Sequence, residues 1–184
     1  VSLGANTSIS GNLDITAGTL NSNGQNITLG GNWTNNGGAF TGGAQTVTFT
    51  GVSKTIGGTT STAFNNVTTS GAASVSTAVA TSIGGNLLVN DGTTFTAAGY
   101  NLTVTGTTTV GNGTSGVLAI SSVTGAKIFN GLVTVASGAT WNNSGNSPAI
   151  FRGGIRNSGS FTAGSGVHTF NTSSQALNGN FTIP

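Results

Sequence analysis

Apolar and polar residues alternate along short stretches of this chain, and Val, Ile, Leu and Phe occupy most of the apolar positions. Residues 45–50 and 101–105 are clear examples. Such alternation is typical of β-strands with one buried face. Pairs that tolerate positive φ, such as Asn23-Gly24 and Asp91-Gly92, separate the stretches. No stretch has the 3.6-residue apolar repeat of a helix, so the pattern predicts an all-β protein.

The alternating stretches recur at intervals of about 20 residues, which is a repeat length found in solenoid proteins. Ile27-Thr28-Leu29 returns one interval later as Val47-Thr48-Phe49, and a similar triplet occurs at residues 168–170. Two longer similarities test the period. Residues 8–13 resemble residues 82–87 at an offset of 74, and residues 38–41 resemble residues 159–162 at an offset of 121. We interpret these offsets as four and six periods.

Short strands, frequent corners and a repeat of this length favour a single-stranded parallel β-solenoid, or β-helix. We expect one domain over residues 1–184, with about nine coils of about 20 residues and uncapped ends. At ~4.8 Å per coil the rod would be roughly 43 Å long. An antiparallel sandwich or barrel is the alternative, because Asn-Gly and Asp-Gly are also good hairpin turns.

The composition argues against most kinds of catalytic and binding site. Only 3% of the residues are charged, with 4 Lys+Arg, 2 Asp+Glu, one His and no Cys. This leaves too few groups for acid–base catalysis or a metal site, and too few cations for a nucleic-acid interface. No apolar run approaches the ~18 residues of a membrane span. We therefore expect no enzyme activity, cofactor, metal, nucleic-acid partner or membrane insertion.

The two ends of the chain suggest assembly. The chain starts at Val1 rather than Met, which indicates a processed chain or a piece of a longer one. The spacing from Phe170 through the end to Ile9 of a following copy is close to one coil. No polar cap is evident, so we expect either a longer solenoid or copies stacked head to tail. The predicted stacking surface consists of Val1, Ser2, Leu3, Phe181, Thr182, Ile183 and Pro184.

Repeated Asn residues and a few large side chains are the remaining candidates. Asn12, Asn32 and Asn86 follow Gly in similar contexts and predict an amide ladder. Trp33 and Trp141 are expected in the core.

Exposed binding residues are the last group. Tyr100 could contact a sugar, and Arg152 and Arg156 could contact an anionic ligand, although a solvated cationic edge is the simpler explanation of both arginines. Threonine-rich outer faces could bind ice, but several coils lack the required Thr-x-Thr.

Three strings carry a family resemblance: residues 31–37, residues 161–170 and residues 8–13. They resemble the Gly/Thr/Asn-rich repeats of large secreted bacterial surface proteins, such as adhesins and autotransporter passengers, which adopt parallel β-helices. The resemblance implies an extracellular or cell-surface protein without enzymatic activity. We expect a structural subunit of a fibre whose partner is another copy of itself. The alternative is a surface adhesin or phage-fibre-like module that binds glycans.

Overall fold

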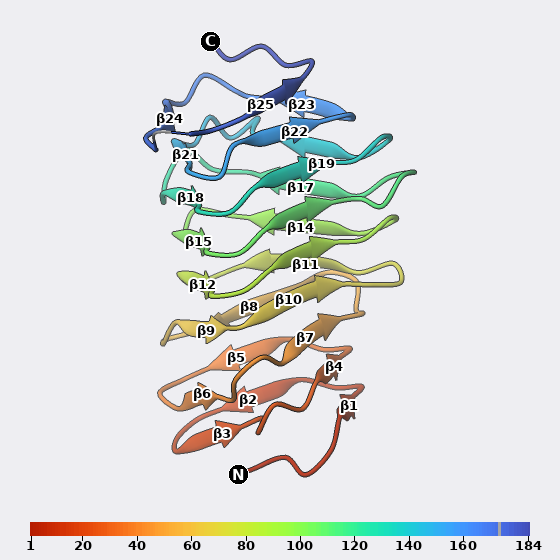
Figure 1. Cartoon of the computed structure of the whole chain (residues 1–184). Coiled ribbons are helices and arrows are strands. Elements are labelled where there is room, and N and C mark those ends of the chain that lie inside the picture. The colour runs from red at the N-terminus through yellow and green to blue at the C-terminus, as the bar shows by residue number, and fades with distance from the viewer. Residues whose placement is uncertain (173) are drawn as a thin grey trace.

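The structure is a computed structural model of the chain, and it describes residues 1–172 and 174–184. The described residues form 25 strands and no helix, and therefore no helix that could cross a membrane. Every strand pair is parallel. Figure 1 shows the strands stacked as rungs, with the N-terminus at one end of the stack and the C-terminus at the other. The predicted β-solenoid is confirmed, and the antiparallel alternative is wrong.

Successive strands pass through three sheets in turn, so that three strands make one turn of the solenoid. The first sheet contains β1 (Thr7–Ile9), β4 (Ile27–Leu29), β7 (Thr46–Phe49), β10 (Asn66–Thr69), β13 (Leu87–Val89), β16 (Thr108–Val110), β19 (Val133–Val135), β22 (Ile155–Asn157) and β25 (Leu177–Gly179). The second sheet contains β2 (Leu13–Ile15), β5 (Trp33–Asn35), β8 (Lys54–Gly58), β11 (Ser74–Thr77), β14 (Thr94–Ala97), β17 (Val117–Ile120), β20 (Thr140–Asn142) and β23 (Ser160–Thr162).

The third side of the solenoid is interrupted. The third sheet contains β9 (Thr62–Phe64), β12 (Thr81–Ile83), β15 (Leu102–Val104), β18 (Lys127–Phe129), β21 (Ala149–Phe151) and β24 (His168–Phe170). Below it, β3 (Thr19–Asn21) and β6 (Ala39–Thr41) form a separate pair.

The number of turns is about eight rather than the nine expected, because nine stacked strands in the first sheet are joined by eight steps. The turns also differ in length. The turn from Thr7 to its partner Ile27 is shorter than the turn from Thr108 to its partner Val133. The repeat is therefore variable in length, and the longer turns place extra residues in the corners.

The two long-range similarities do not mark whole turns, and this part of the interpretation is wrong. Ile9 lies in the first sheet, whereas Ile83 lies in the third. Phe40 and Phe161 also belong to different sides of the solenoid. The offsets of 74 and 121 correspond to 11 and 17 strands, because β1 is similar to β12 and β6 to β23. The repeated sequence unit is thus one strand with its corner, and three such units make one turn.

The core is a column of inward-facing residues, and its largest members are aromatic. Trp33 and Trp141 are fully buried, as predicted. The Trp33 ring lies edge-on to Phe40 at 4.7 Å and to Phe64 at 4.9 Å. Trp141 stacks on Phe161 at 5.5 Å. Such contacts add to the stabilisation from burial itself, and they link one rung to the next.

Close packing of the rungs requires glycine at some corners. A Cβ on Gly31 would collide with the backbone of Gly11, one turn earlier. A Cβ on Gly11 itself would meet nothing. This corner therefore tolerates only glycine where another rung lies beneath it, whereas at the end of the stack it has room for a side chain.

Candidate functional site

The N-terminal end of the solenoid is an open rung. Residues 1–3 run beside β3, where the Leu3 amide donates to the Asn21 carbonyl (2.9 Å) and the Asn21 amide donates to the Val1 carbonyl (2.8 Å). The Val1 ammonium donates to the Thr19 carbonyl (2.7 Å). Among the described residues, no strand pairs with the outer edges of this segment, β1 or β2. A hollow of about 260 Å³ opens here, lined by Val1, Leu13, Asp14, Ile15, Thr16, Ala17, Thr19 and Leu20.

The C-terminal end is a second open rung. β25 pairs with β22 on one side and has no strand on the other among the described residues. Beyond it, the Phe181 ring packs on Phe161 at 5.4 Å, so this segment lies over the second sheet. The Asn157 amide donates to the Asn180 carbonyl (2.6 Å) and holds the segment in place. A hollow of about 530 Å³ is lined by Phe161, Gly179, Asn180, Phe181 and Thr182.

The two ends present the same three sides. Residues 1–3, β1 and β2 form the first rung, on the third, first and second sides respectively. β24, β25 and the segment around Phe181 form the last rung on the same three sides.

The spacing that joined Phe170 to Ile9 is wrong as a measure of one coil, because these residues belong to different sheets. If two copies were joined directly end to end, the number of residues from Leu177 of one copy to Thr7 of the next would be smaller than in the described turns of the first sheet. Those turns run, for example, from Thr7 to Ile27 and from Thr108 to Val133.

The predicted asparagine ladder is two ladders. The Oδ1 atom of Asn12 accepts the Asn32 amide (2.9 Å), and Asn32 in turn accepts the Thr55 amide (3.0 Å). Asn86 instead accepts the Thr107 amide (2.8 Å) and donates its own amide to Asn66 Oδ1 (2.9 Å). The equivalence of Asn86 with Asn12 and Asn32 is therefore wrong, since they precede strands of different sheets. Both ladders satisfy backbone N–H groups at corners.

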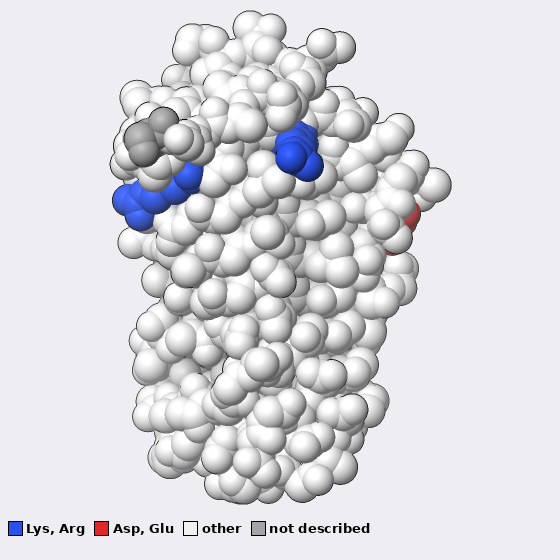
Figure 2. Space-filling view, viewed as in Figure 1, with Lys and Arg blue, Asp and Glu red and all other residues white. Residues whose placement is uncertain are grey.

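Tyr100 lies on a different turn from Arg152, which follows β21, and Arg156, which lies in β22. Tyr100 precedes β15 and is 47% exposed. Arg152 follows β21 and donates to the amide oxygens of Asn130 (3.0 Å) and Asn171 (3.4 Å), on the turns before and after it. Arg156 projects outward from β22. Figure 2 shows two separate Lys/Arg patches in the upper part of this face and neither sign of charge in the lower half. Arg152 thus has structural partners, and no composite site forms.

Lys127 has a role that the sequence analysis did not identify. Its side chain is fully buried in the third sheet, between Leu102 and Ala149. Its Nζ donates to the carbonyl oxygens of Tyr100 (2.8 Å), Thr124 (3.0 Å) and Gly125 (2.6 Å). Burial lowers the pKa of Lys127 to about 8. The sequence does contain a signal for this burial, because Lys127 occupies an inward-facing position in an alternating strand.

The acidic and imidazole groups have structural positions. Asp91 Oδ1 accepts the amides of Asn112 (2.7 Å) and Ser115 (3.0 Å), and these hydrogen bonds lower the pKa of Asp91. The half-buried His168 ring stacks on Phe151, and burial lowers the pKa of His168. Among the described residues, no three His, Asp or Glu side chains come together as metal ligands would.

Comparison of the chain with protein-family models, with curated proteins and with solved structures finds no match. The two ends of the solenoid and its side faces are therefore the features that bear on function.

Proposed function

We propose that the chain is a structural subunit of an extracellular fibre, built by copies that stack head to tail and continue the solenoid. The single observation that carries this proposal is the match between the two end rungs. Both present three parallel edges on the same three sides, so one copy can be placed on another without changing the direction of winding. The extracellular setting is supported by the resemblance of the repeats to those of secreted surface proteins.

The register of the joint follows from the existing columns. In the first sheet, Leu177 of one copy would lie opposite Thr7 of the next, and Asn178 opposite Ser8. In the second, the segment around Phe181 would lie over β2, because Phe181 packs on Phe161 of that sheet and β2 is the first strand of the sheet. The two first-sheet contacts continue a column of the solenoid core and a column of its outer face.

The energetics of the ends favour such a joint. A strand edge with free N–H and C=O groups is a template for pairing with another chain. Leu13 and Leu20 line the hollow at the N-terminal end, and Phe181 lines the hollow at the C-terminal end. When two copies stack, the apolar surface of these residues would be buried, which is favourable. Of the described residues that line the two hollows, only Asp14 and the N-terminal Val1 carry a charge, so little repulsion opposes the contact.

Engineered disulfides test the joint directly, because the chain has no cysteine of its own. Ser8 and Asn178 both lie at outward-facing central positions, in the first and last strands of the first sheet. At the joint their Cα atoms would be one strand spacing apart, ~4.8 Å, which a disulfide can bridge. The S8C/N178C variant should therefore form a ladder of covalent oligomers on mild oxidation, visible by non-reducing electrophoresis.

Two control variants make the result specific. T68C/N178C has its first cysteine on the central strand β10 and should remain monomeric. T28C/T48C joins neighbouring strands β4 and β7 and should form an intramolecular bond. A ladder of equal extent from T68C/N178C, or no ladder from S8C/N178C when T28C/T48C oxidises, would rule out the head-to-tail joint.

A further inference from the structure

The interruption of the third side, between β6 and β9, creates a groove away from both ends. β3 and β6 pair with each other, and β9 begins the next sheet, but no strand pairing joins β6 to β9. The chain from Ala39 at the start of β6 to Thr62 at the start of β9 is longer than the preceding step from Thr19 to Ala39. The groove has a volume of about 370 Å³, within the range of small-molecule sites.

Backbone groups face each other across this groove. The Ala39 amide donates to Gly18 and the Thr41 carbonyl accepts from Ser22, so these neighbours of Phe40 point toward β3. Because directions alternate along a strand, the N–H and C=O of Phe40 point toward β9. Likewise the Phe64 carbonyl accepts from Gly84, and the backbone of Ala63 therefore points toward β6. Both strands thus present backbone donors and acceptors without a partner in a strand ladder.

The floor of the groove is aromatic and rigid. The core residues Phe40 and Phe64 lie beneath the groove, with ring centroids 6.0 Å apart and exposed fractions of 9% and 3%. Trp33 contacts both rings edge-on, and its Nε1 donates to Thr62 Oγ1 (2.9 Å). The floor is therefore preformed, and a ligand would not have to order it.

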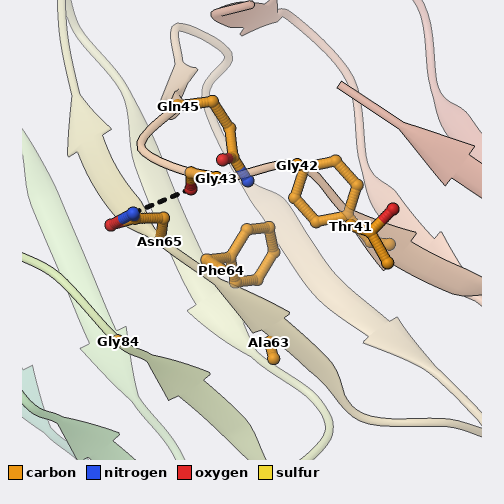
Figure 3. A pocket seen from close by; sticks show the side chains of 9 residues that line it. Thr41, Gly42, Gly43, Gln45, Ala63, Phe64, Asn65 and Gly84 are labelled. Carbon is orange, nitrogen blue, oxygen red and sulfur yellow. Dashed lines mark hydrogen bonds between the residues drawn. The ribbon is translucent and has the colours of Figure 1, made fainter. Parts of the chain in front are cut away.

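The walls carry neutral hydrogen-bonding groups. Figure 3 shows Thr41, Gly43 and Gln45 on one side and Ala63, Phe64 and Asn65 on the other. The Asn65 amide donates to the Gly43 carbonyl (2.8 Å) and bridges the two walls. With its amide nitrogen facing inward, Gln45 donates to the carbonyls of Gly42 (2.8 Å) and Gly43. None of the lining residues has an ionisable side chain.

We infer that this groove binds a neutral saccharide, one or two sugar rings in size. Sugar hydroxyls both donate and accept, and the groove offers the Thr41 hydroxyl, the Asn65 amide and two sets of backbone groups of both kinds. An inserted peptide strand fits less well, because β6 and β9 have Cα atoms within 8 Å of each other and insertion would need about 9.6 Å.

The experiment compares two matched substitutions. Ala63→Phe fills the groove from the exposed central position of β9. Thr103→Phe places the same side chain at the equivalent position of β15, two turns away. Thr41→Ala removes one hydroxyl from an exposed position of β6 and leaves the packing intact. The probes are maltose, cellobiose and N-acetylglucosamine, with glucuronate as a charged comparison and a neutral Ala/Thr hexapeptide as a strand, measured by saturation-transfer NMR and titration.

The wild type and Thr103→Phe should bind at least one of the neutral sugars in preference to glucuronate. Affinity should fall about tenfold or more in Ala63→Phe and by a smaller factor in Thr41→Ala. The absence of binding to all three neutral sugars, binding of the hexapeptide alone, or unchanged affinity in both groove variants would overturn the inference. Cross-linking of S8C/N178C is independent of these residues, so the two proposals can fail separately.

Discussion

At the residue scale, Lys127 is the one charged side chain that the described part of the chain buries completely. Its ammonium donates only to carbonyl oxygens, and the carbonyls of Thr124 and Gly125 come from the corner just before it. That corner belongs to a long turn, the one that runs from Leu102 to its partner Lys127. The extra residues thus form a cage of partial negative charge around a cation that has been removed from water.

The titration of Lys127 should make stability depend on pH. Its pKa is about 8 in the folded chain and 10.5 when unperturbed. Between these values the unfolded state binds more protons, so stability rises with pH. We expect the unfolding free energy of the wild type, relative to K127M, to increase by up to about 3 kcal/mol between pH 7 and pH 10.5. Urea denaturation of both chains at several pH values measures this difference.

A direct titration of Lys127 does not depend on the folding of K127M. The ¹³Cε shift of Lys127, followed by NMR in the wild type, should have its midpoint near pH 8. A midpoint at or above 10 would contradict the effect of burial, and a constant stability difference would contradict the linkage.

Asp91, at an exposed corner, also loses its contribution as the pH falls, but in a much lower pH range than Lys127. Hydrogen bonds from Asn112 and Ser115 hold its pKa below 3.8. The carboxylate therefore organises residues 111–116 above that range, and this organisation is lost as pH falls through the lowered pKa. The amide proton shifts of Asn112 and Ser115 should titrate with a midpoint below 3.8. Shifts that do not titrate, or that titrate equally in D91N, would show that this contact is absent.

At the scale of elements, each strand is positioned by the strand one turn before it, and the corners set how closely turns approach. Gly31 stacks on Gly11, and only the absence of a side chain allows this approach. Gly58 has φ of +114° and lies against the Asn35 backbone in the same way. Corner glycines therefore fix the spacing of the turns as much as the strand pairing does.

Substitution at the same corner in two successive turns tests this role. Gly31→Ala should lower the unfolding free energy by roughly 2 to 4 kcal/mol, because the new Cβ meets backbone that cannot move aside. Gly11→Ala should have little effect on the monomer, since its Cβ would meet nothing. Thermal and urea unfolding of the two variants provide the measurement. Equal losses would show that glycine is needed there for another reason.

The sequence predicts the strands well and their sheets poorly. The apolar residues Ile27, Val47 and Leu102 of the alternating stretches are all buried in strands, because alternation arises when one face of a strand is buried. The three sides of a turn use the same strand-and-corner pattern, so the sequence does not say which side a strand joins. For this reason the sequence wrongly suggests that Asn86 is equivalent to Asn12. For the same reason, offsets of 11 and 17 strands, which are two strands more than a whole number of turns, resemble whole turns.

The candidate sites depend on contacts between turns, which a linear pattern does not contain. The cage of Lys127 uses the carbonyl of Tyr100, 27 residues earlier. The groove lies where β9 does not pair with β6, among the described residues. The end rungs could be anticipated, because the segments near both termini continue the strand pattern. Their sheet positions required the structure.

At the scale of the whole molecule, each turn contacts mainly the turns next to it, as the sheet order shows. Stability in such a stack is approximately a sum of terms for each turn and each interface, and the terminal turns have one interface instead of two. β25 is accordingly exposed along its whole length, whereas β10 and β13 bury their inward residues.

Hydrogen exchange should follow this order. In dilute solution, amides of β1 and β25 should exchange fastest, and those of strands β10 to β17 slowest. At concentrations where S8C/N178C cross-links, β1 and β25 should become protected while the central strands change little. Uniform protection along a monomeric chain would contradict the nearest-neighbour description of the stack.

Because all the strand pairs are parallel, the stack has a direction, and its two faces are chemically distinct. Leu13 and Leu20 line the hollow at one tip, and Phe161 and Phe181 line the hollow at the other. A fibre built from such subunits would have structural polarity, and its two tips would elongate at different rates. A chain unable to present one face would terminate growth at a single tip and leave the opposite tip active.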